Sequence, residues 1–179
     1  MSDAIRVGLV GFGYASKTFH APLIGGTPGM ALKAVASSDA DKVHADWPGV
    51  KVMSAPGDLL DDPDIDLVVI ATPNDTHFPL AKAALEAGKH VVVDKPFTVT
   101  LSQARELESL AKHCGRILSV FHNRRWDSDF LTVSALINEG QLGEVCYFES
   151  HFDRFRPQVR QRWREQAGPG SGIWYDLAP

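Results

Sequence analysis

The sequence contains few of the residues from which disulfide frameworks and metal centres are built. Its two cysteines, Cys114 and Cys146, lie in unrelated segments and form no redox or zinc-binding spacing. None of its seven histidines is spaced from another as a pair of helical metal ligands would be, and no H-E-x-x-H occurs. We therefore expect no metal site, no nucleophilic cysteine, and a reduced, cytoplasmic protein.

Long apolar runs and an excess of positive charge are also missing. No apolar run approaches the roughly 18 residues of a membrane-spanning helix, and residues 1–6 contain no apolar signal core. The net charge of −4 argues against a general nucleic-acid partner. Arginines and aromatics do alternate from Arg154 to Arg164, as in some single-strand binders. Because acidic residues flank these arginines and the whole chain is acidic, a surface exposed to solvent or to an interface is favoured over nucleic-acid binding. Alternatively, one or two of the arginines contact a polar substrate.

Through about residue 121, short apolar runs alternate with helix-like segments. This alternation predicts an α/β protein with a doubly wound parallel sheet, a Rossmann dinucleotide-binding domain over residues 1–121. Helices are expected through residues 17–20, over 76–87, and from Thr100 or Ser102 to Gly115. Strands are expected at 5–10, 32–36, 50–53, 66–71, 90–93 and 117–121.

The pattern changes after residue 121. Phe130, Val133 and Ile137 predict a helix that ends at Gly140, and residues 145–155 alternate as a long strand with two different faces would. This is the beginning of a second, α+β architecture. Because residues 122–179 are few to bury a core of their own, we expect them to be the incomplete start of a C-terminal domain.

A glycine turn follows the first predicted strand. Gly11-Phe12-Gly13-Tyr14-Ala15-Ser16 is a G-x-G-x-x-S variant of the dinucleotide fingerprint. The first glycine permits the tight turn, and the second lets the backbone approach a pyrophosphate at the helix N-terminus. Ser16 is small enough to take the third position, where helix packs on strand. In this strand–turn–helix context, the motif predicts a dinucleotide site.

The end of the second predicted strand bears on the choice between NADP and NAD. NAD enzymes usually carry an acidic residue there, about 20 positions after the glycines, that binds the ribose 2′-hydroxyl. Here Ser37 and Ser38 fill that position, and Lys42 follows. The missing negative charge and the three donors favour the 2′-phosphate of NADP. NAD stays open, because no arginine is present and Asp39 is near enough to serve.

Lys95 follows a valine run, Val91-Val92-Val93-Asp94, and precedes Pro96. The run suits a parallel strand buried on both faces, and Pro96 keeps the lysine out of helical geometry. Lys95 is therefore expected at the carboxyl edge of the sheet, where open α/β sheets bind ligands. Beside a nicotinamide, its charge would stabilise the alkoxide that forms on a substrate hydroxyl. For an isolated lysine, a solvated surface role would be the simpler interpretation.

The combined motifs resemble the glucose–fructose oxidoreductase/inositol dehydrogenase (Gfo/Idh/MocA) family over essentially the whole chain. Family members usually have Glu-Lys-Pro where this chain has Asp94-Lys95-Pro96. The Ser37-Ser38 segment further resembles NADP-using scyllo-inositol dehydrogenases. The matching features are Gly11-Phe12-Gly13, Ala71-Thr72-Pro73-Asn74 with His77, Glu86-Ala87-Gly88-Lys89-His90-Val91, and Asp94-Lys95-Pro96.

The resemblance implies roles for particular residues. The backbone from Phe12 to Ala15 would cradle the pyrophosphate, Asp94 and Lys95 would contact cofactor and substrate, and Asn123 would lie near the nicotinamide. The positions expected along the cofactor are Thr72, Pro73, Asn74 and His77. A satisfied histidine on a helix face is an equal alternative for His77.

The C-terminal segment from Gly172 to Pro179 resembles the family's G-x-x-x-D-x-x-x-H helix. The family histidine exchanges the hydroxyl proton, and the aspartate, here Asp176, orients it. The histidine position would follow Pro179 directly, so the resemblance implies a fragment of a longer enzyme, inactive by itself. It also implies that the full-length protein is a homo-oligomer.

Two functions from different classes are consistent with these residues. The first is an NAD(P)-dependent oxidoreductase acting on a secondary alcohol or ketone of a cyclitol, sugar or related polyol. The second is a dinucleotide-binding module that senses the cofactor without chemistry. Lys95, Asn123 and Asp176 favour the enzyme, because a pure binding module needs none of them.

Overall fold

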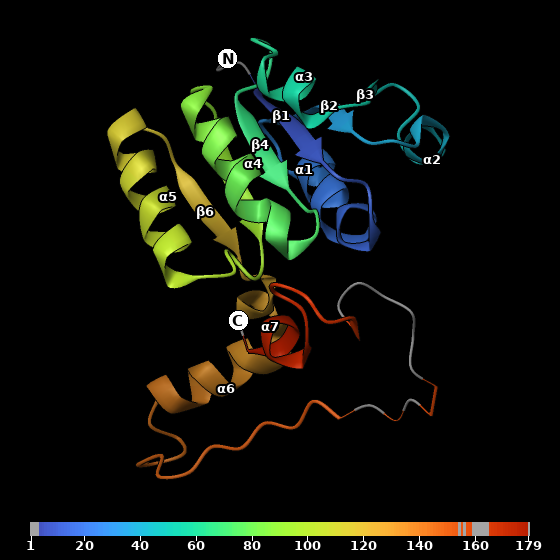
Figure 1. Cartoon of the computed structure of the whole chain (residues 1–179). Helices are drawn as coiled ribbons and strands as arrows, with labels where there is room; N and C mark the ends of the chain where they lie inside the picture. Colours follow the sequence, from blue (N-terminus) through green and yellow to red (C-terminus); the bar gives the residue numbers. More distant parts are fainter. Residues whose placement is uncertain (1–3, 154, 156, 159–164, 179) are drawn as a thin grey trace.

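A computed structural model of the chain describes residues 4–153, 155, 157–158 and 165–178. Its centre is a six-stranded sheet in the order β3-β2-β1-β4-β5-β6, with every neighbouring pair parallel (Figure 1). The predicted Rossmann-type fold is thereby confirmed. The strands are β1 (Ile5–Val10), β2 (Met30–Ala36), β3 (Lys51–Met53), β4 (Leu67–Ile70), β5 (His90–Asp94) and β6 (Leu118–Phe121).

Helices connect the strands. Thr100 and Gln103 begin α5 with a reciprocal capping box, and Gly115 ends it in a left-handed conformation at φ 63°. The single-turn helices α2 and α3 were not predicted, because five residues are too few to show a helical period. The helices of this part are η1 (Ser16–His20), α1 (Ala21–Gly26), α2 (Ala40–His44), α3 (Pro56–Leu60), α4 (Asn74–Glu86) and α5 (Leu101–Cys114).

Two hydrophobic cores lie on opposite faces of the sheet. In β5, Val91 and Val93 join the core beneath α4 and α5, whereas Val92 packs with the core beneath α1 and α2. In β4, Val68 and Val69 divide in the same way. A strand covered on both faces needs apolar side chains at successive positions, which explains the valine run.

The strand order reverses between β1 and β4. From β1 the chain proceeds outward to β2 and β3, whereas β4, β5 and β6 extend in the other direction. The connections after β1 and β4 therefore leave the sheet on opposite sides. Such a switch point opens a crevice at the carboxyl ends of the strands.

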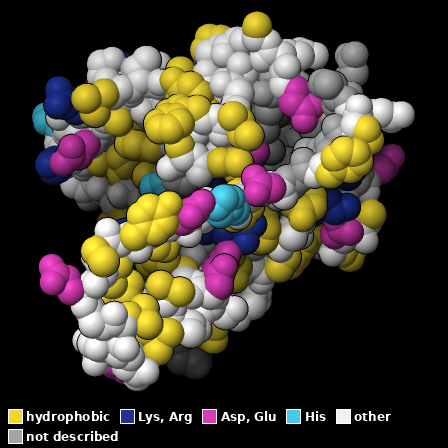
Figure 2. All heavy atoms as spheres, turned by 90° about the horizontal axis from the view of Figure 1, so that it is seen from below, with side chains coloured by type: hydrophobic (Ala, Val, Ile, Leu, Met, Phe, Trp, Pro, Cys, Tyr) yellow, Lys and Arg dark blue, Asp and Glu magenta, His cyan; other side chains and the backbone are white. Residues whose placement is uncertain are grey.

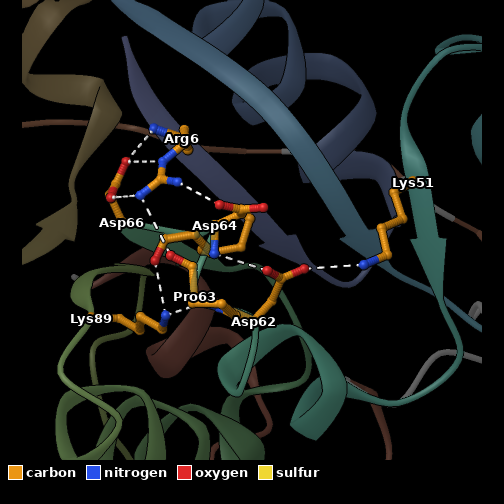
Figure 3. A network of polar contacts seen from close by, with 8 residues as sticks. Arg6, Lys51, Asp62, Pro63, Asp64, Asp66 and Lys89 are labelled. Atoms are coloured by element: carbon orange, nitrogen blue, oxygen red, sulfur yellow. Dashed lines mark hydrogen bonds and ion pairs between the residues drawn. The ribbon is translucent and has the colours of Figure 1, made fainter. Parts of the chain in front are cut away.

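A charged network occupies the opposite, amino edge of the sheet (Figure 3). The guanidinium of Arg6 in β1 makes a two-pronged contact with Asp66, with N···O distances of 2.7 and 2.9 Å, and the Arg6 backbone N–H donates to the same carboxylate. Nearby, the buried Lys89 donates to the carbonyl oxygens of Asp62 and Ile65. The network ties β1 and β5 to the segment that enters β4.

This network predicts a stability loss in acid. Hydrogen bonds from Arg6 lower the pKa of Asp66 to about 2. A carboxyl whose pKa is depressed by folding stabilises the protein above its unfolded pKa, and that contribution disappears as the pH falls from about 4 towards 2. In Asp66→Asn we expect a Tm lower by about 2–4 °C at neutral pH, since a pair this exposed contributes about 1 kcal/mol.

The measurement is Tm against pH by circular dichroism. Asp66→Asn should show a flatter acid limb than the unaltered chain between pH 4 and 2. Asp64→Asn is the matched control, because this 82% exposed carboxylate contacts only one guanidinium nitrogen. Equal acid limbs for Asp66→Asn and the unaltered chain would contradict the prediction.

The described residues after β6 are much less buried than those of the sheet and its helices. They form η2 (Asn123–Trp126), α6 (Ser128–Asn138) and α7 (Ile173–Leu177). The predicted helix before Gly140 is present, yet α6 buries none of its residues. Figure 2, viewed from the side of α6 and α7, shows hydrophobic side chains exposed on this face. The large hydrophobic residues of α6 that are exposed are Phe130, Leu131, Val133 and Ile137.

The long strand predicted for residues 145–155 is wrong. Residues 145–153 and 155 adopt no strand conformation, and their side chains are exposed. An extended segment becomes a strand only by backbone pairing, and within the described part of the chain no strand lies beside it. The arginines at 154, 156, 160, 162 and 164 lie outside the described residues. Within the described ranges, no helix is long and apolar enough to cross a membrane.

Candidate functional site

The glycine turn after β1 has the form that a pyrophosphate cradle requires. Gly11 has φ +88°, and a Cβ there would lie 2.8 Å from the carbonyl oxygen of Ala71. A Cβ on Gly13 would meet nothing within 4 Å, so that its backbone borders open space where the helix begins. Ser16 is fully buried, and its hydroxyl donates to the Gly11 carbonyl at 2.8 Å. Ser16, at the third position of the motif, thus fixes the start of the helix against the turn that follows β1.

A pocket of about 430 Å³ opens beside this turn, at the carboxyl ends of β1, β2 and β3. It brings together six of the predicted cofactor residues, from three separate segments. A helix N-terminus and an accessible backbone next to such a pocket fit a dinucleotide. These predicted residues are Gly11, Phe12, Ser37, Ser38, Lys42 and Thr72.

Asp39 is engaged in capping α2. Its carboxylate accepts a hydrogen bond from the Lys42 backbone N–H at 3.0 Å, and its own N–H donates to the Ser37 hydroxyl at 3.2 Å. If the Asp39 side chain turned towards a ribose, α2 would lose its N-cap, which would lower the stability by about 1 kcal/mol. The Lys42 ammonium is exposed, and no acidic partner contacts it in the described part of the chain.

The loop after β4 contains Thr72 and Pro73, and Asn74 begins α4. Thr72 and Thr76 share a hydroxyl–hydroxyl bond of 2.6 Å. Asn74 is 4% exposed, and its amide donates to the Gly170 carbonyl at 2.6 Å. The loop is therefore joined to the segment that precedes α7. Contact between the Asn74 side chain and a cofactor stays a prediction.

His77 in α4 is completely buried. Its ring nitrogens lie 2.8 Å from the carbonyl oxygen of Pro96 and 3.0 Å from that of Thr72. The imidazole thus bridges the loops after β5 and β4. Each ring nitrogen of His77 thus faces a carbonyl oxygen, and the N–H of a neutral ring can donate to one of the two. A further contact with a cofactor stays a prediction.

Lys95 follows β5 directly, at the carboxyl edge, as predicted. Its ammonium contacts both the main-chain oxygen of Asp176 and the Asp176 carboxylate, the latter at 3.2 Å. The Lys95–Pro96 peptide bond is cis. Tyr175 of α7 donates its hydroxyl to the Val99 carbonyl at 3.1 Å. Two residues far apart in sequence, Lys95 and Asp176, are therefore brought together by the docking of α7.

Two further residues complete this edge. Asn123 is half-buried and begins η2, two residues after β6 ends. His20 was not singled out from the sequence, because a lone histidine offers no spacing signal. It is 3% exposed, and its Nε2 donates to the Asp94 carboxylate at 3.3 Å.

The edge thus presents an anion-binding turn with an adjoining pocket and a cation held by a carboxylate. The turn can bind the phosphates of a dinucleotide. The cation can stabilise negative charge that develops on a substrate oxygen.

Comparison with known proteins agrees with this geometry. Residues 5–122 match a family described as an oxidoreductase family with an NAD-binding Rossmann fold. Residues 134–179 match the C-terminal alpha/beta domain of an oxidoreductase family.

Individual relatives resemble the whole chain but are longer. The chain is 79% identical over its full length to the uncharacterized oxidoreductase YdgJ of Escherichia coli, of which it covers 52%. It is 39% identical, over 98% of its length, to the scyllo-inositol 2-dehydrogenase (NADP(+)) IolW of Bacillus subtilis, of which it covers 49%. A solved structure of a Yersinia pestis protein, described as a putative oxidoreductase, superposes with a TM-score of 0.92 at 68% identity, over 99% of this chain and 50% of that one. The chain spans about half the length of these relatives.

Proposed function

The chain belongs to the Gfo/Idh/MocA oxidoreductase family, and from this membership we propose that it serves hydride transfer between NADP and a polyol. The substrate would be a secondary alcohol, or the corresponding ketone, of a cyclitol, sugar or related polyol. The single observation that carries the proposal is the placement of the Lys95–Asp176 pair on the same sheet edge as the Gly11–Gly13 turn. A module that only sensed the cofactor would need the turn and not the pair.

The residues at the carboxyl edge of the sheet would have different roles. The backbone of the Gly11–Ser16 turn would hold the pyrophosphate, and the pocket bordered by Ser37 would hold the adenosine half. When bound, the nicotinamide accepts or supplies the hydride. Lys95 would hold the substrate oxygen and stabilise it as an alkoxide, and Asp176 would orient the lysine. The hydroxyl proton would pass to the family's histidine, supplied by the rest of a longer protein and oriented by Asp176 as the resemblance implies. Asn123 would lie at the nicotinamide end.

NADP is proposed over NAD because of the charges around the pocket. A 2′-phosphate there would meet the hydroxyls of Ser37 and Ser38 and the exposed ammonium of Lys42. The carboxylate of Asp39 also borders the pocket, but one of its oxygens caps α2, so turning it towards a ribose 2′-hydroxyl would lose that cap. The NADP-dependent IolW, at 39% identity, supports the same choice.

We propose further that turnover belongs to a longer, homo-oligomeric cytoplasmic protein. Residues 1–121 would be its dinucleotide domain, and 122–179 the beginning of its substrate domain. The exposed apolar side chains of α6 and the lengths of the relatives support this division. The 179-residue chain by itself would bind the cofactor and turn over little or no substrate.

A fluorescence titration with NADPH and NADH tests the cofactor assignment on the chain itself. We expect NADPH to bind more tightly, and Gly13→Val to weaken its binding at least about tenfold, because a side chain there blocks the approach of the pyrophosphate. The Cβ has open space and the φ is not positive, so the Tm of this variant should stay within about 2 °C of the unaltered value.

Gly49→Val is the matched control. A Cβ at Gly49 also meets nothing within 4 Å, and the residue does not border the pocket. Its affinity for NADPH should equal that of the unaltered chain. Binding of neither dinucleotide, or full affinity in Gly13→Val, would contradict the proposed site.

A further inference from the structure

Lys95 lies between two residues that are each held by a buried histidine. On the amino side, the Asp94 carboxylate accepts from His20 at 3.3 Å. On the carboxyl side, the Pro96 carbonyl lies 2.8 Å from a ring nitrogen of His77. The two imidazoles are 3% and 0% exposed. The flanks of the lysine are thus fixed from separate directions.

The histidines come from the two segments that carry the predicted cofactor contacts. His20 ends the π-helical stretch η1, in the helix that follows the glycine turn, and its ring packs on Phe121 at 4.3 Å between centroids. π-Helical turns occur frequently at functional sites. The second ring nitrogen of His77 lies 3.0 Å from the carbonyl oxygen of Thr72. Each imidazole therefore connects one cofactor-facing segment to the Lys95 loop.

Packing alone does not account for these residues. A buried polar ring costs free energy unless it is hydrogen-bonded, and an apolar side chain would fill either position without that cost. What the imidazoles add is their polar contacts. One polar contact of each imidazole falls on a residue beside Lys95, which is Asp94 for His20 and Pro96 for His77.

The Asp94 carboxylate transmits the restraint. One of its oxygens accepts from His20, and the other accepts from the Lys95 backbone N–H at 2.7 Å. Lysine has a long side chain with high rotamer entropy, so an exact direction of its ammonium requires a fixed backbone. We infer that His20 and His77 are positioning residues that aim Lys95 at Asp176 and the substrate oxygen, and so couple the lysine to the cofactor-binding segments. The inference rests on the proposed function for the role of Lys95 towards substrate.

Competitive acetylation of the 179-residue chain, quantified by mass spectrometry, tests the inference without any cofactor. Lys95 should react slowly, because its ammonium donates to Asp176. The exposed Lys33 is the internal reference for intrinsic reactivity. The 8% exposed Lys89, at the opposite edge of the sheet, reports general loosening of the fold.

In His20→Phe and His77→Phe we expect the Lys95/Lys33 labelling ratio to rise about fivefold, because a flanking hydrogen bond is lost. The Lys89/Lys33 ratio should not change. His20→Gln and His77→Gln retain an N–H donor and should restore slow labelling of Lys95. His113→Phe, on the exposed side of α5, is the control and should resemble the unaltered chain.

An unchanged Lys95 ratio in both Phe variants would overturn the inference, and so would a parallel rise at Lys89. If His20→Phe fails to fold, Asp94→Ala removes the contact with His20 and should give the same rise at Lys95 alone; slow labelling in that variant would overturn the role of His20. If His77→Phe fails to fold, His77→Leu takes its place with the same expected rise, and slow labelling of Lys95 in that variant would overturn the role of His77. NADPH titration of the unaltered chain is independent of the labelling. Failure to bind NADPH would overturn the proposed function and leave the labelling to decide the inference.

Discussion

Lys95→Ala is expected to lower kcat at least about 100-fold, since removal of one preorganised donor to a developing oxyanion typically has that effect. The enzyme for this test is a chimera that joins residues 1–179 to the remaining half of the 79% identical E. coli relative. The measurement is NADPH formation or consumption at 340 nm with inositols and sugars. The KM for the dinucleotide should change much less than kcat, because most of the predicted cofactor contacts lie at the glycine turn and its pocket, which do not include Lys95.

Two variants separate the charge of Lys95 from its packing. Lys95→Arg keeps a cation and should retain more activity than Lys95→Ala, although its planar fork does not reproduce the contact with Asp176. Lys33→Ala removes an exposed lysine from β2 and should leave kcat unchanged. Turnover in Lys95→Ala equal to that of the unaltered chimera would eliminate the proposed role of the lysine.

The sheet was predictable because its signal is local. Each central strand is a short apolar run between turn residues, and burial on both faces demands such runs. The position of Lys95 was predictable for the same reason, since it depends only on the end of β5 and on Pro96. The glycine turn was predictable because the sequence also predicts a strand before it and a helix after it, which is the context that the motif requires.

The supporting contacts of the site were not predictable. His20 contacts Asp94, 74 residues away in sequence, and Asn74 contacts Gly170 across 96 residues. No spacing rule connects residues that only the tertiary fold brings together. The failed strand at 145–155 has a related cause, because alternation shows that a segment can pair and does not provide its partner.

Ser37→Asp is expected to reverse the preference between the two dinucleotides. Ser37 follows the last residue of β2 and borders the pocket, so a carboxylate there faces the position expected for a 2′-phosphate. Repulsion between the two anions should weaken NADPH binding about 30-fold, equivalent to about 2 kcal/mol. The carboxylate can also accept from a ribose 2′-hydroxyl, so that NADH affinity should rise.

Local structure should tolerate this substitution. The Ser37 hydroxyl accepts from the Asp39 backbone N–H and donates weakly, at 3.3 Å, to the Asp39 carbonyl. An aspartate oxygen can take over the accepting role, and only the longer contact is lost. Ser102→Asp adds the same charge in the first turn of α5, away from the pocket, and is the matched control. Both variants should therefore fold, and only Ser37→Asp should change the ratio of the two dissociation constants.

The dependence of NADPH affinity on salt concentration tests independently whether charge repulsion is the cause of the loss in Ser37→Asp. If the loss of NADPH affinity in Ser37→Asp arises from repulsion, raising the ionic strength from 0.01 to 0.15 M should reduce it, because the screening length falls from about 30 to about 8 Å. In the unaltered chain the same increase should weaken NADPH binding, since Lys42 then attracts the 2′-phosphate less. An unchanged NADPH-to-NADH ratio in Ser37→Asp at low salt would show that the 2′-phosphate is not bound at the end of β2.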